Sequence, residues 1–218
     1  MTEYTETELQ QKYDDFIKYI KDHFTGDRLK KLLKLYHEDE FGTRLTLATA
    51  SGKEHFHLAH CGGYISHIMN VCKAAGGVKK LWLGMGGTID FTDEEMIFSC
   101  LHHDLGKLGD VKGHEYYLPN ESEWHRKNKG MIFEINGKLQ YMDVAERALY
   151  ILQAYEIKIS EREWLSIRLA DGCYSEANKQ YLISYNKSHQ LHSNLPYIVH
   201  EADFISCRTE YDQWNAQQ

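Results

Sequence analysis

Apolar residues recur at helical intervals along most of this chain and divide it into amphipathic segments. The spacing predicts helices over residues 6–23 and 27–37, a helix that starts within 60–75 and runs to about residue 80, and a final helix over roughly 195–213. In the third of these helices, one face carries apolar residues at helical spacing: Tyr64, Ile68, Val71, Ala75 and Val78. This face should be buried, and His67 lies on or beside it.

Three further helices begin at a capping box, in which Ser, Thr or Asp is followed three residues later by Glu. The three starts are Thr92 with Glu95, Asp143 with Glu146, and Ser160 with Glu163. The first of these helices is expected to reach residue 104.

The remaining segments add little regular structure to these helices. Residues 131–142 alternate in polarity about an Asn-Gly turn, which is typical of a β-hairpin. Residues 40–56 read as a loop or a short strand, and the chain shows neither internal repeats nor a linker that would separate domains. The sequence therefore predicts an all-α fold, a single domain over residues 1–218 with N-terminal helices in 1–40, and one small hairpin.

Composition narrows the class of protein. The formal net charge of −7 over 218 residues argues against broad electrostatic binding of nucleic acid, although it does not exclude a small anionic substrate. Five scattered cysteines with no CxxC pair read as reduced thiols, and the polar N-terminus does not resemble a signal or transit peptide. No apolar run is long enough for a membrane helix. We therefore expect a cytoplasmic protein without a membrane partner.

Four residues with metal-binding side chains occupy faces that should be buried. Asp104 continues the apolar stripe before it at i+7, with His103 adjacent, and Asp203 lies beside the apolar stripe of the last helix. With His67, these residues form a mixed nitrogen and oxygen set on three helices. A buried carboxylate or imidazole needs a partner, so a common divalent metal explains all four.

These residues match the ordered H…HD…D pattern of the HD-domain superfamily of metal-dependent phosphohydrolases. The segments HLAHCGGYISHIMNV, CLHHDLGK and EADFISCR resemble three motifs of that superfamily, and the similarity spans a core of roughly residues 55–210. The resemblance implies an all-α HD bundle in which His67, His103, Asp104 and Asp203 bind one divalent metal, with Mn, Mg, Fe, Co and Ni as candidates. It also implies that Lys107 lies near the substrate phosphate.

The resemblance extends less completely to a second metal. His125 occupies the position of the first additional histidine ligand, whereas Asp171 stands in LADG, where relatives carry HHG. An aspartate could still bind Mg²⁺ or Mn²⁺ through oxygen, or it could merely cap a turn. We therefore expect a mononuclear or weakly dinuclear site.

The chemistry implied is hydrolysis of a phosphate ester or anhydride of a nucleotide or deoxynucleotide by metal-activated water. Asp104, Lys107 and His125 are then the catalytic candidates. The candidates for substrate binding share positive charge, imidazole or an aromatic ring: His57, His60, Lys107, Arg126, Lys129 and Tyr174. The alternatives are a 3′–5′ exonuclease, a di-iron oxygenase of the same superfamily, or a nucleotide-binding regulator without catalysis. The sequence is also compatible with a homo-oligomer whose subunits share the pocket.

Overall fold

The computed structural model describes residues 4–38, 41–56 and 58–218, and these are mostly helical, as predicted. The longer elements are α1 (Glu6–His23), α2 (Gly26–Leu33), α3 (Phe41–Leu47), α4 (Gly63–Gly84), α5 (Asp93–His102), β1 (Tyr117–Pro119), α6 (Glu123–Lys129), β2 (Phe133–Ile135), α7 (Val144–Ala154), α8 (Glu161–Arg168), α9 (Lys179–Leu182) and α10 (Leu195–Asn215). A π-helical turn covers Lys34–Glu38, and short 3₁₀ turns cover Leu105–Leu108, Gly172–Tyr174, Glu176–Asn178 and Lys187–His189. None of the described helices is long and apolar enough to cross a membrane.

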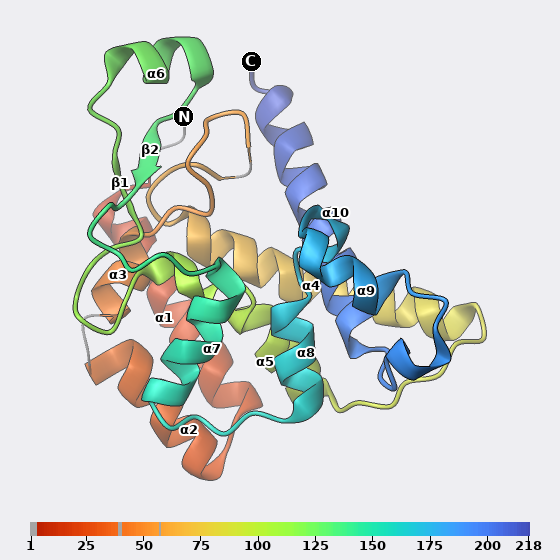
Figure 1. Cartoon of the computed structure of the whole chain (residues 1–218). Helices are drawn as coiled ribbons and strands as arrows, with labels where there is room; N and C mark the ends of the chain where they lie inside the picture. Colours follow the sequence, from red (N-terminus) through yellow and green to blue (C-terminus); the bar gives the residue numbers. More distant parts are fainter. Residues whose placement is uncertain (1–3, 39–40, 57) are drawn as a thin grey trace.

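The two longest helices, α4 and α10, pack against each other through the centre of the molecule (Figure 1). α5 packs against α4, α8 lies against both α5 and α10, and α7 covers the 3₁₀ turn at 105–108. The core between them is apolar and rich in aromatic rings, among them Phe16, Tyr36, Tyr64 and Phe98, all fully buried. This arrangement brings α4, the end of α5 and α10 together, although they are far apart in the sequence.

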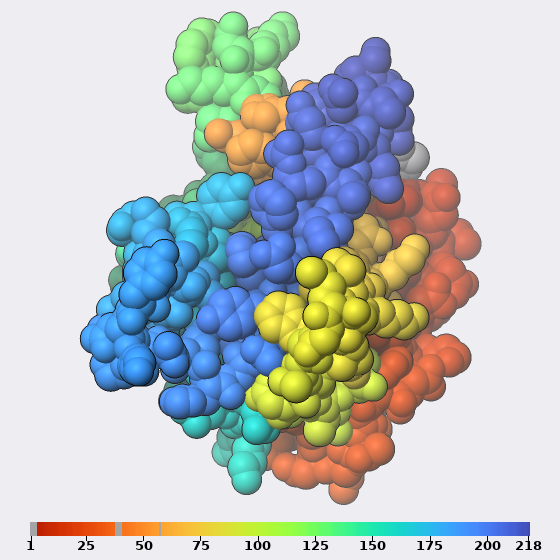
Figure 2. Space-filling model, turned by 90° about the vertical axis from the view of Figure 1, so that its right-hand side faces the viewer, coloured from red at the N-terminus to blue at the C-terminus, as the bar shows by residue number. Residues whose placement is uncertain are grey.

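α6 and the two strands project from the helical body. Figure 2 shows this projection, in green, at the top of the molecule above the orange segment near residue 55, with the end of α10, in dark blue, beside it. The projection is tied to the segment before α4, because Glu54 N donates to Gly130 O at 2.8 Å and Phe133 N donates to Gly52 O at 3.0 Å.

Local capping explains where several helices begin. The boxes predicted at Thr92–Glu95 and Ser160–Glu163 are both present, with each hydroxyl accepting from the third backbone N–H. Asp143 precedes α7 as predicted, but its side chain makes no capping hydrogen bond. The helix start was therefore correct there, while the bond expected to fix it is absent.

A buried ion pair joins the N-terminal helices to the rest of the bundle. Arg28 on α2 donates from Nη1 and Nη2 to the two carboxylate oxygens of Glu163 on α8, at 2.7 and 2.8 Å. Glu163 is fully buried, and its carboxylate also accepts from Ser160 N at 2.7 Å. Such a bidentate pair fixes the relative position of two elements, and its loss would leave an uncompensated charge in the core.

The sheet differs from the hairpin predicted over 131–142. β2 pairs antiparallel with β1, Tyr117 opposite Ile135, and residues 138–142 form no strand. The reason lies in Asn136, which is buried: its N donates to Tyr116 O at 2.9 Å and its Nδ2 to Glu115 O at 2.9 Å. The Asn side chain thus extends the pairing with the earlier strand, and the chain then turns towards α7.

The loop or strand expected over 40–56 is also partly wrong, because residues 41–47 form α3, which packs against α1 and α4. Arg44 from this helix donates to the carbonyl oxygens of Leu108 and Asp110, both at 2.8 Å. The Asp110 carboxylate closes the same loop by accepting from the backbone N–H of Lys112 at 2.9 Å and of His114 at 3.0 Å. Burial opposes its ionisation, but these bonds and the His114 side chain outweigh burial and lower the Asp110 pKa.

Candidate metal centre

Three side chains converge on one point where α4, the end of α5 and α10 meet. His67 comes from the middle of α4, His103 from the end of α5 and Asp203 from α10, and one ligand atom from each lies within 4.8 Å of the others. Asp203 Oδ1 lies 3.2 Å from His67 Nε2 and 3.6 Å from His103 Nε2. Both imidazoles are buried, whereas the Asp203 side chain is 16% exposed. The cluster is therefore closed on the helix side and open at the carboxylate.

Asp104 adds a fourth ligand-type group to this cluster. Its Oδ2 lies 3.7 Å from His67 Nε2, 3.6 Å from His103 Nε2 and 2.5 Å from Lys107 Nζ. The chain leaves α5 here through the 3₁₀ turn, which needs Gly106, because a Cβ there would lie 2.2 Å from the Val144 carbonyl oxygen of α7. The close packing of this turn on α7 holds Asp104 and Lys107 at the cluster.

A second carboxylate on α10 orients His67 from behind. Glu210 is buried, and its Oε2 lies 3.0 Å from His67 Nδ1, while its Oε1 accepts from Asn70 Nδ2 at 2.8 Å. His103 is held similarly, with Nδ1 2.8 Å from the Cys100 carbonyl oxygen. Partners of this kind keep the Nε2 atom of a ligating histidine turned towards a metal.

Sequence reasoning did not single out Glu210, although a signal for it existed. It continues the buried stripe of α10 that passes through Val199, Ala202 and Ser206. A carboxylate on that stripe has the same unusual position as Asp203, seven residues earlier on the helix. Spacing on one helix could therefore have identified it.

The pKa values reflect the density of charge at this point. Burial disfavours the His67 imidazolium, but hydrogen bonds to Asp203 and Glu210 outweigh burial and raise its pKa to about 10. Burial likewise opposes ionisation of Asp203 and Asp104, yet the neighbouring histidines, and Lys107 for Asp104, hold both carboxyl pKa values below their usual range. The carboxylates are thus charged at neutral pH and available as oxygen ligands.

The donor set fits a divalent transition metal or Mg²⁺. Among the described residues, the buried Nε2 of His103 has no hydrogen-bond partner, and it points to the same place as Asp203 Oδ1. Two imidazole nitrogens with one or two carboxylates suit Mn, Fe, Co or Ni, and the oxygens suit Mg. His67, His103 and Asp203 are therefore the residues that could hold the ion, with Asp104 beside them.

The comparisons do not place the chain in a family. No family model, curated protein or solved structure matches it. A functional interpretation depends on the site itself and on the motifs in the sequence.

Two cavities adjoin the cluster, and both are lined by Asp104, Lys107, Asp171 and Tyr174. The first, of about 670 Å³, lies along α10 and is rich in aromatic rings; the second, of about 590 Å³, lies towards α7. The structure thus places Asp171, predicted as a ligand of a second metal, and Tyr174, predicted to bind substrate, in cavities beside the cluster.

A tight contact holds the segment that carries Asp171 and Tyr174 against α10. Gly172 has φ of +54°, and a Cβ there would lie 2.0 Å from the His200 ring. His200 Nδ1 in turn lies 2.8 Å from the Ala170 carbonyl oxygen. Glycine in LADG is therefore required by a left-handed conformation and by the imidazole above it.

Other residues predicted for the site are not brought to the cluster. His125, Arg126 and Lys129 lie on α6 in the projecting part of the fold, where His125 Nδ1 lies 2.8 Å from Ser122 Oγ (Figure 1). His60 lies against the Tyr4 ring, at a centroid distance of 5.2 Å. His57 lies outside the described residues.

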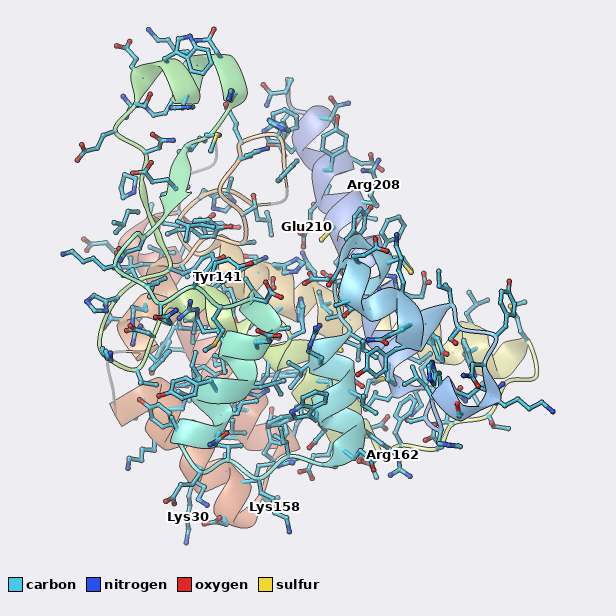
Figure 3. All side chains as sticks on the ribbon, in the orientation of Figure 1. Lys30, Tyr141, Lys158, Arg162, Arg208 and Glu210 are labelled. Atoms are coloured by element: carbon cyan, nitrogen blue, oxygen red, sulfur yellow. The ribbon has the colours of Figure 1, made fainter. Side chains whose placement is uncertain are left out.

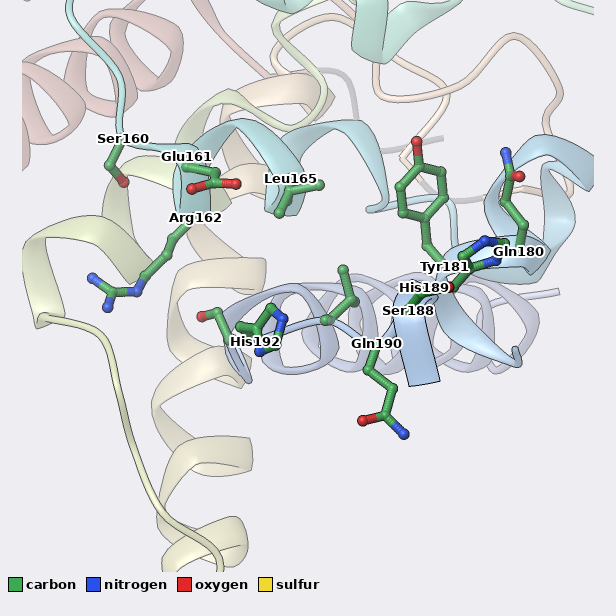
Figure 4. Close-up of a pocket in the computed structure, with 12 residues that line it drawn as sticks. Ser160, Glu161, Arg162, Leu165, Gln180, Tyr181, Ser188, His189, Gln190 and His192 are labelled. Atoms are coloured by element: carbon green, nitrogen blue, oxygen red, sulfur yellow. The ribbon is translucent and has the colours of Figure 1, made fainter. Parts of the chain in front are cut away.

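Three further histidines lie away from the cluster. His102 is fully buried against Phe98 and Tyr36, and burial lowers its pKa to about 3. His189 and His192 line a cavity of about 700 Å³ between the start of α8 and residues 188–193 (Figure 4). None of the residues that line this cavity belongs to the cluster.

Proposed function

We propose that this protein is a metal-dependent phosphohydrolase of the HD type, which cleaves a phosphate ester or anhydride of a nucleotide. The observation that carries this proposal is the convergence of His67, His103 and Asp203 within 4.8 Å, with the Lys107 ammonium beside Asp104 in the wall of two cavities. Buried histidine and aspartate ligands next to a cation-lined cavity suit water activation and phosphate binding together.

The cavity along α10 supports a substrate that contains an aromatic base. Its aromatic lining includes Phe56 and Phe204, which are 46% and 40% exposed, together with Tyr174 and Tyr211. Arg208 lies over the Tyr211 ring at 5.4 Å, and Figure 3 shows it on α10 near the buried Glu210. Exposed rings of this kind provide stacking surfaces for a nucleobase.

The chain's own residues divide the work of hydrolysis. A divalent ion held at the cluster would lower the pKa of a bound water and neutralise phosphoryl charge. Burial opposes the charge of Lys107, but Asp104 outweighs it and raises the pKa of the ammonium, which therefore remains a hydrogen-bond donor for a phosphate oxygen. Asp104, which accepts from Lys107, fixes that donor at the edge of the cluster.

The proposal is tested by measuring product release from a panel of nucleoside and deoxynucleoside mono-, di- and triphosphates with Mn²⁺ or Mg²⁺. Asp203→Asn should abolish hydrolysis and weaken metal binding, because it removes the charge of the carboxylate that lies within 3.6 Å of both histidines. Asp212→Asn is the matched control, since it makes the same change at an exposed position of α10.

Hydrolysis that is lost in Asp203→Asn and retained in Asp212→Asn would support the proposal. If the wild type binds Mn²⁺ and turns over no nucleotide, the nucleotide hydrolase is refuted. Activity on oligonucleotide ends alone would favour the exonuclease, and bound iron with a charge-transfer absorption would favour the oxygenase.

A further inference from the structure

A buried arginine faces the second cavity beside the cluster. Arg147, on the first turn of α7, is 4% exposed and lines the cavity of about 590 Å³ together with Asp104 and Lys107. The Arg147 Cβ packs closely on the 3₁₀ turn at 105–108, because a Cβ added at Gly106 would lie only 3.0 Å from it. Arg147 and Lys107 thus place two cations in the wall of one cavity.

The guanidinium of Arg147 has few partners for a buried charge. Among the described residues, its only hydrogen bond runs from Nη2 to the Gln140 carbonyl oxygen at 2.6 Å, and Nε has none. Among the described residues, no carboxylate forms an ion pair with Arg147. Asp143 and Asp171 line the same cavity, but both are exposed and neither is paired with it. A buried charge left in this state is costly unless an anion binds to it.

Two other arginines, one partly buried and one largely exposed, are paired with carboxylates. Arg28 makes its bidentate bond to Glu163. Arg162, in the wall of the cavity in Figure 4, lies 3.3 Å from Asp90 Oδ2 and 3.7 Å from Glu95 Oε1. Arg147 forms no such ion pair with the described residues, and it shares a cavity wall with Lys107 and Asp104 beside the cluster.

We propose that the Arg147 cavity binds a second phosphoryl group of the substrate, beyond the one that is cleaved, so that the substrate is a nucleoside di- or triphosphate. This assignment rests on the proposed function and deepens it. A guanidinium fork matches phosphate oxygens in two parallel hydrogen bonds, and the same cavity is lined by the Lys107 ammonium beside the cluster. The aromatic cavity, which Lys107 also lines, is then left for the base.

The geometry orders the substrate along the two cavities. Asp104, Lys107, Asp171 and Tyr174 belong to both walls, so a ligand that spans the two cavities would pass these four residues. The outer rim of the Arg147 cavity includes Tyr141, which is 86% exposed and lies above α7 (Figure 3). A monophosphate would fill the shared part and leave Arg147 without an anion.

The decisive experiment compares the affinity of the Mg²⁺-loaded protein for tripolyphosphate and for orthophosphate by titration calorimetry. The wild type should bind tripolyphosphate at least tenfold more tightly. Arg147→Gln should lose that preference and keep its orthophosphate affinity within twofold, while Arg147→Lys should show an intermediate preference, because it retains the charge without the fork. Arg162→Gln is the matched control, since it removes the same charge from the wall of another cavity and should behave as the wild type.

Thermal unfolding of each variant shows whether it is folded. If Arg147→Gln does not fold, the tripolyphosphate preference of Arg147→Lys is the test. An unchanged tripolyphosphate preference in a folded Arg147 variant would overturn the inference, as would a wild type without any preference. Hydrolysis of nucleotides measured in parallel separates this failure from that of the proposed function. Turnover of monophosphates with no role for Arg147 would leave the hydrolase standing, whereas an Arg147-dependent preference without turnover would keep the anion site and refute the hydrolase.

Discussion

Glu210 offers the sharpest test of how α10 arranges the candidate metal centre. One of its carboxylate oxygens lies 3.0 Å from His67 Nδ1, and the other accepts from Asn70 Nδ2 at 2.8 Å. Glu210 is 2% exposed, so solvent has little access to these contacts. Glu210→Ala removes the acceptor and the charge that orient His67. Glu210→Gln keeps an acceptor and loses only the charge.

Removing a hydrogen-bond partner of a ligating histidine weakens metal affinity by about 10- to 100-fold. We expect about tenfold for Glu210→Gln and nearer a hundredfold for Glu210→Ala, which correspond to about 1.4 and 2.7 kcal/mol of binding free energy. The graded order follows from the structure, because the glutamine can still accept from His67 while Asn70, which is exposed, is free to rotate.

The assay is equilibrium binding of Mn²⁺, measured by competition with a chelating dye at constant pH. Glu201→Gln is the control, because it removes an exposed carboxylate from the same helix. A folded Glu210→Ala variant that binds Mn²⁺ as tightly as the wild type would refute the claim that this carboxylate positions His67.

Three further outcomes concern stability and can be measured by urea or thermal unfolding. Arg28→Ala should lower the free energy of unfolding by about 3–5 kcal/mol, because it leaves the fully buried Glu163 charge unpaired; a loss below 1 kcal/mol would contradict this. Gly172→Ala should cost about 3 kcal/mol against about 1 kcal/mol for Gly26→Ala, since both have positive φ but only the former would place its Cβ 2.0 Å from an imidazole; equal losses would disprove the contact. Asp110→Asn should destabilise by about 1–2 kcal/mol at pH 7 and progressively less below pH 4, because the lowered pKa makes the carboxylate stabilising above 3.8 and its contribution disappears on protonation; a pH-independent loss would show that its charge is irrelevant.

Features determined by neighbouring residues were the ones the sequence could predict. Periodicity located α1, α4 and α10, and the Thr92 and Ser160 caps located α5 and α8, since both signals lie within a few turns of one helix. The same reasoning placed His67, His103 and Asp203 on buried faces, and the structure brings them together. Their roles in binding a metal and in catalysis remain predictions.

Features determined by distant contacts were missed or misread. The Asn-Gly turn signal suggested strands on either side of it, but Asn136 bonds to Glu115 and Tyr116, which precede it by about 20 residues. α3 is short and forms where α1 and α4 pack on it. Arg147 looks like an ordinary charged helix position until α7 is placed on the 3₁₀ turn, which buries it.

The contact between His67 and Glu210 closes a loop of 143 residues, and this length has a kinetic consequence. Closing such a long loop costs chain entropy before any contact is gained, so α10 should dock on α4 late, after the helices nearer in sequence have assembled. An ion held between these helices would therefore stabilise contacts that are absent from the folding transition state. It would slow unfolding while leaving the rate of folding unchanged, so that the metal would act on the lifetime of the native state.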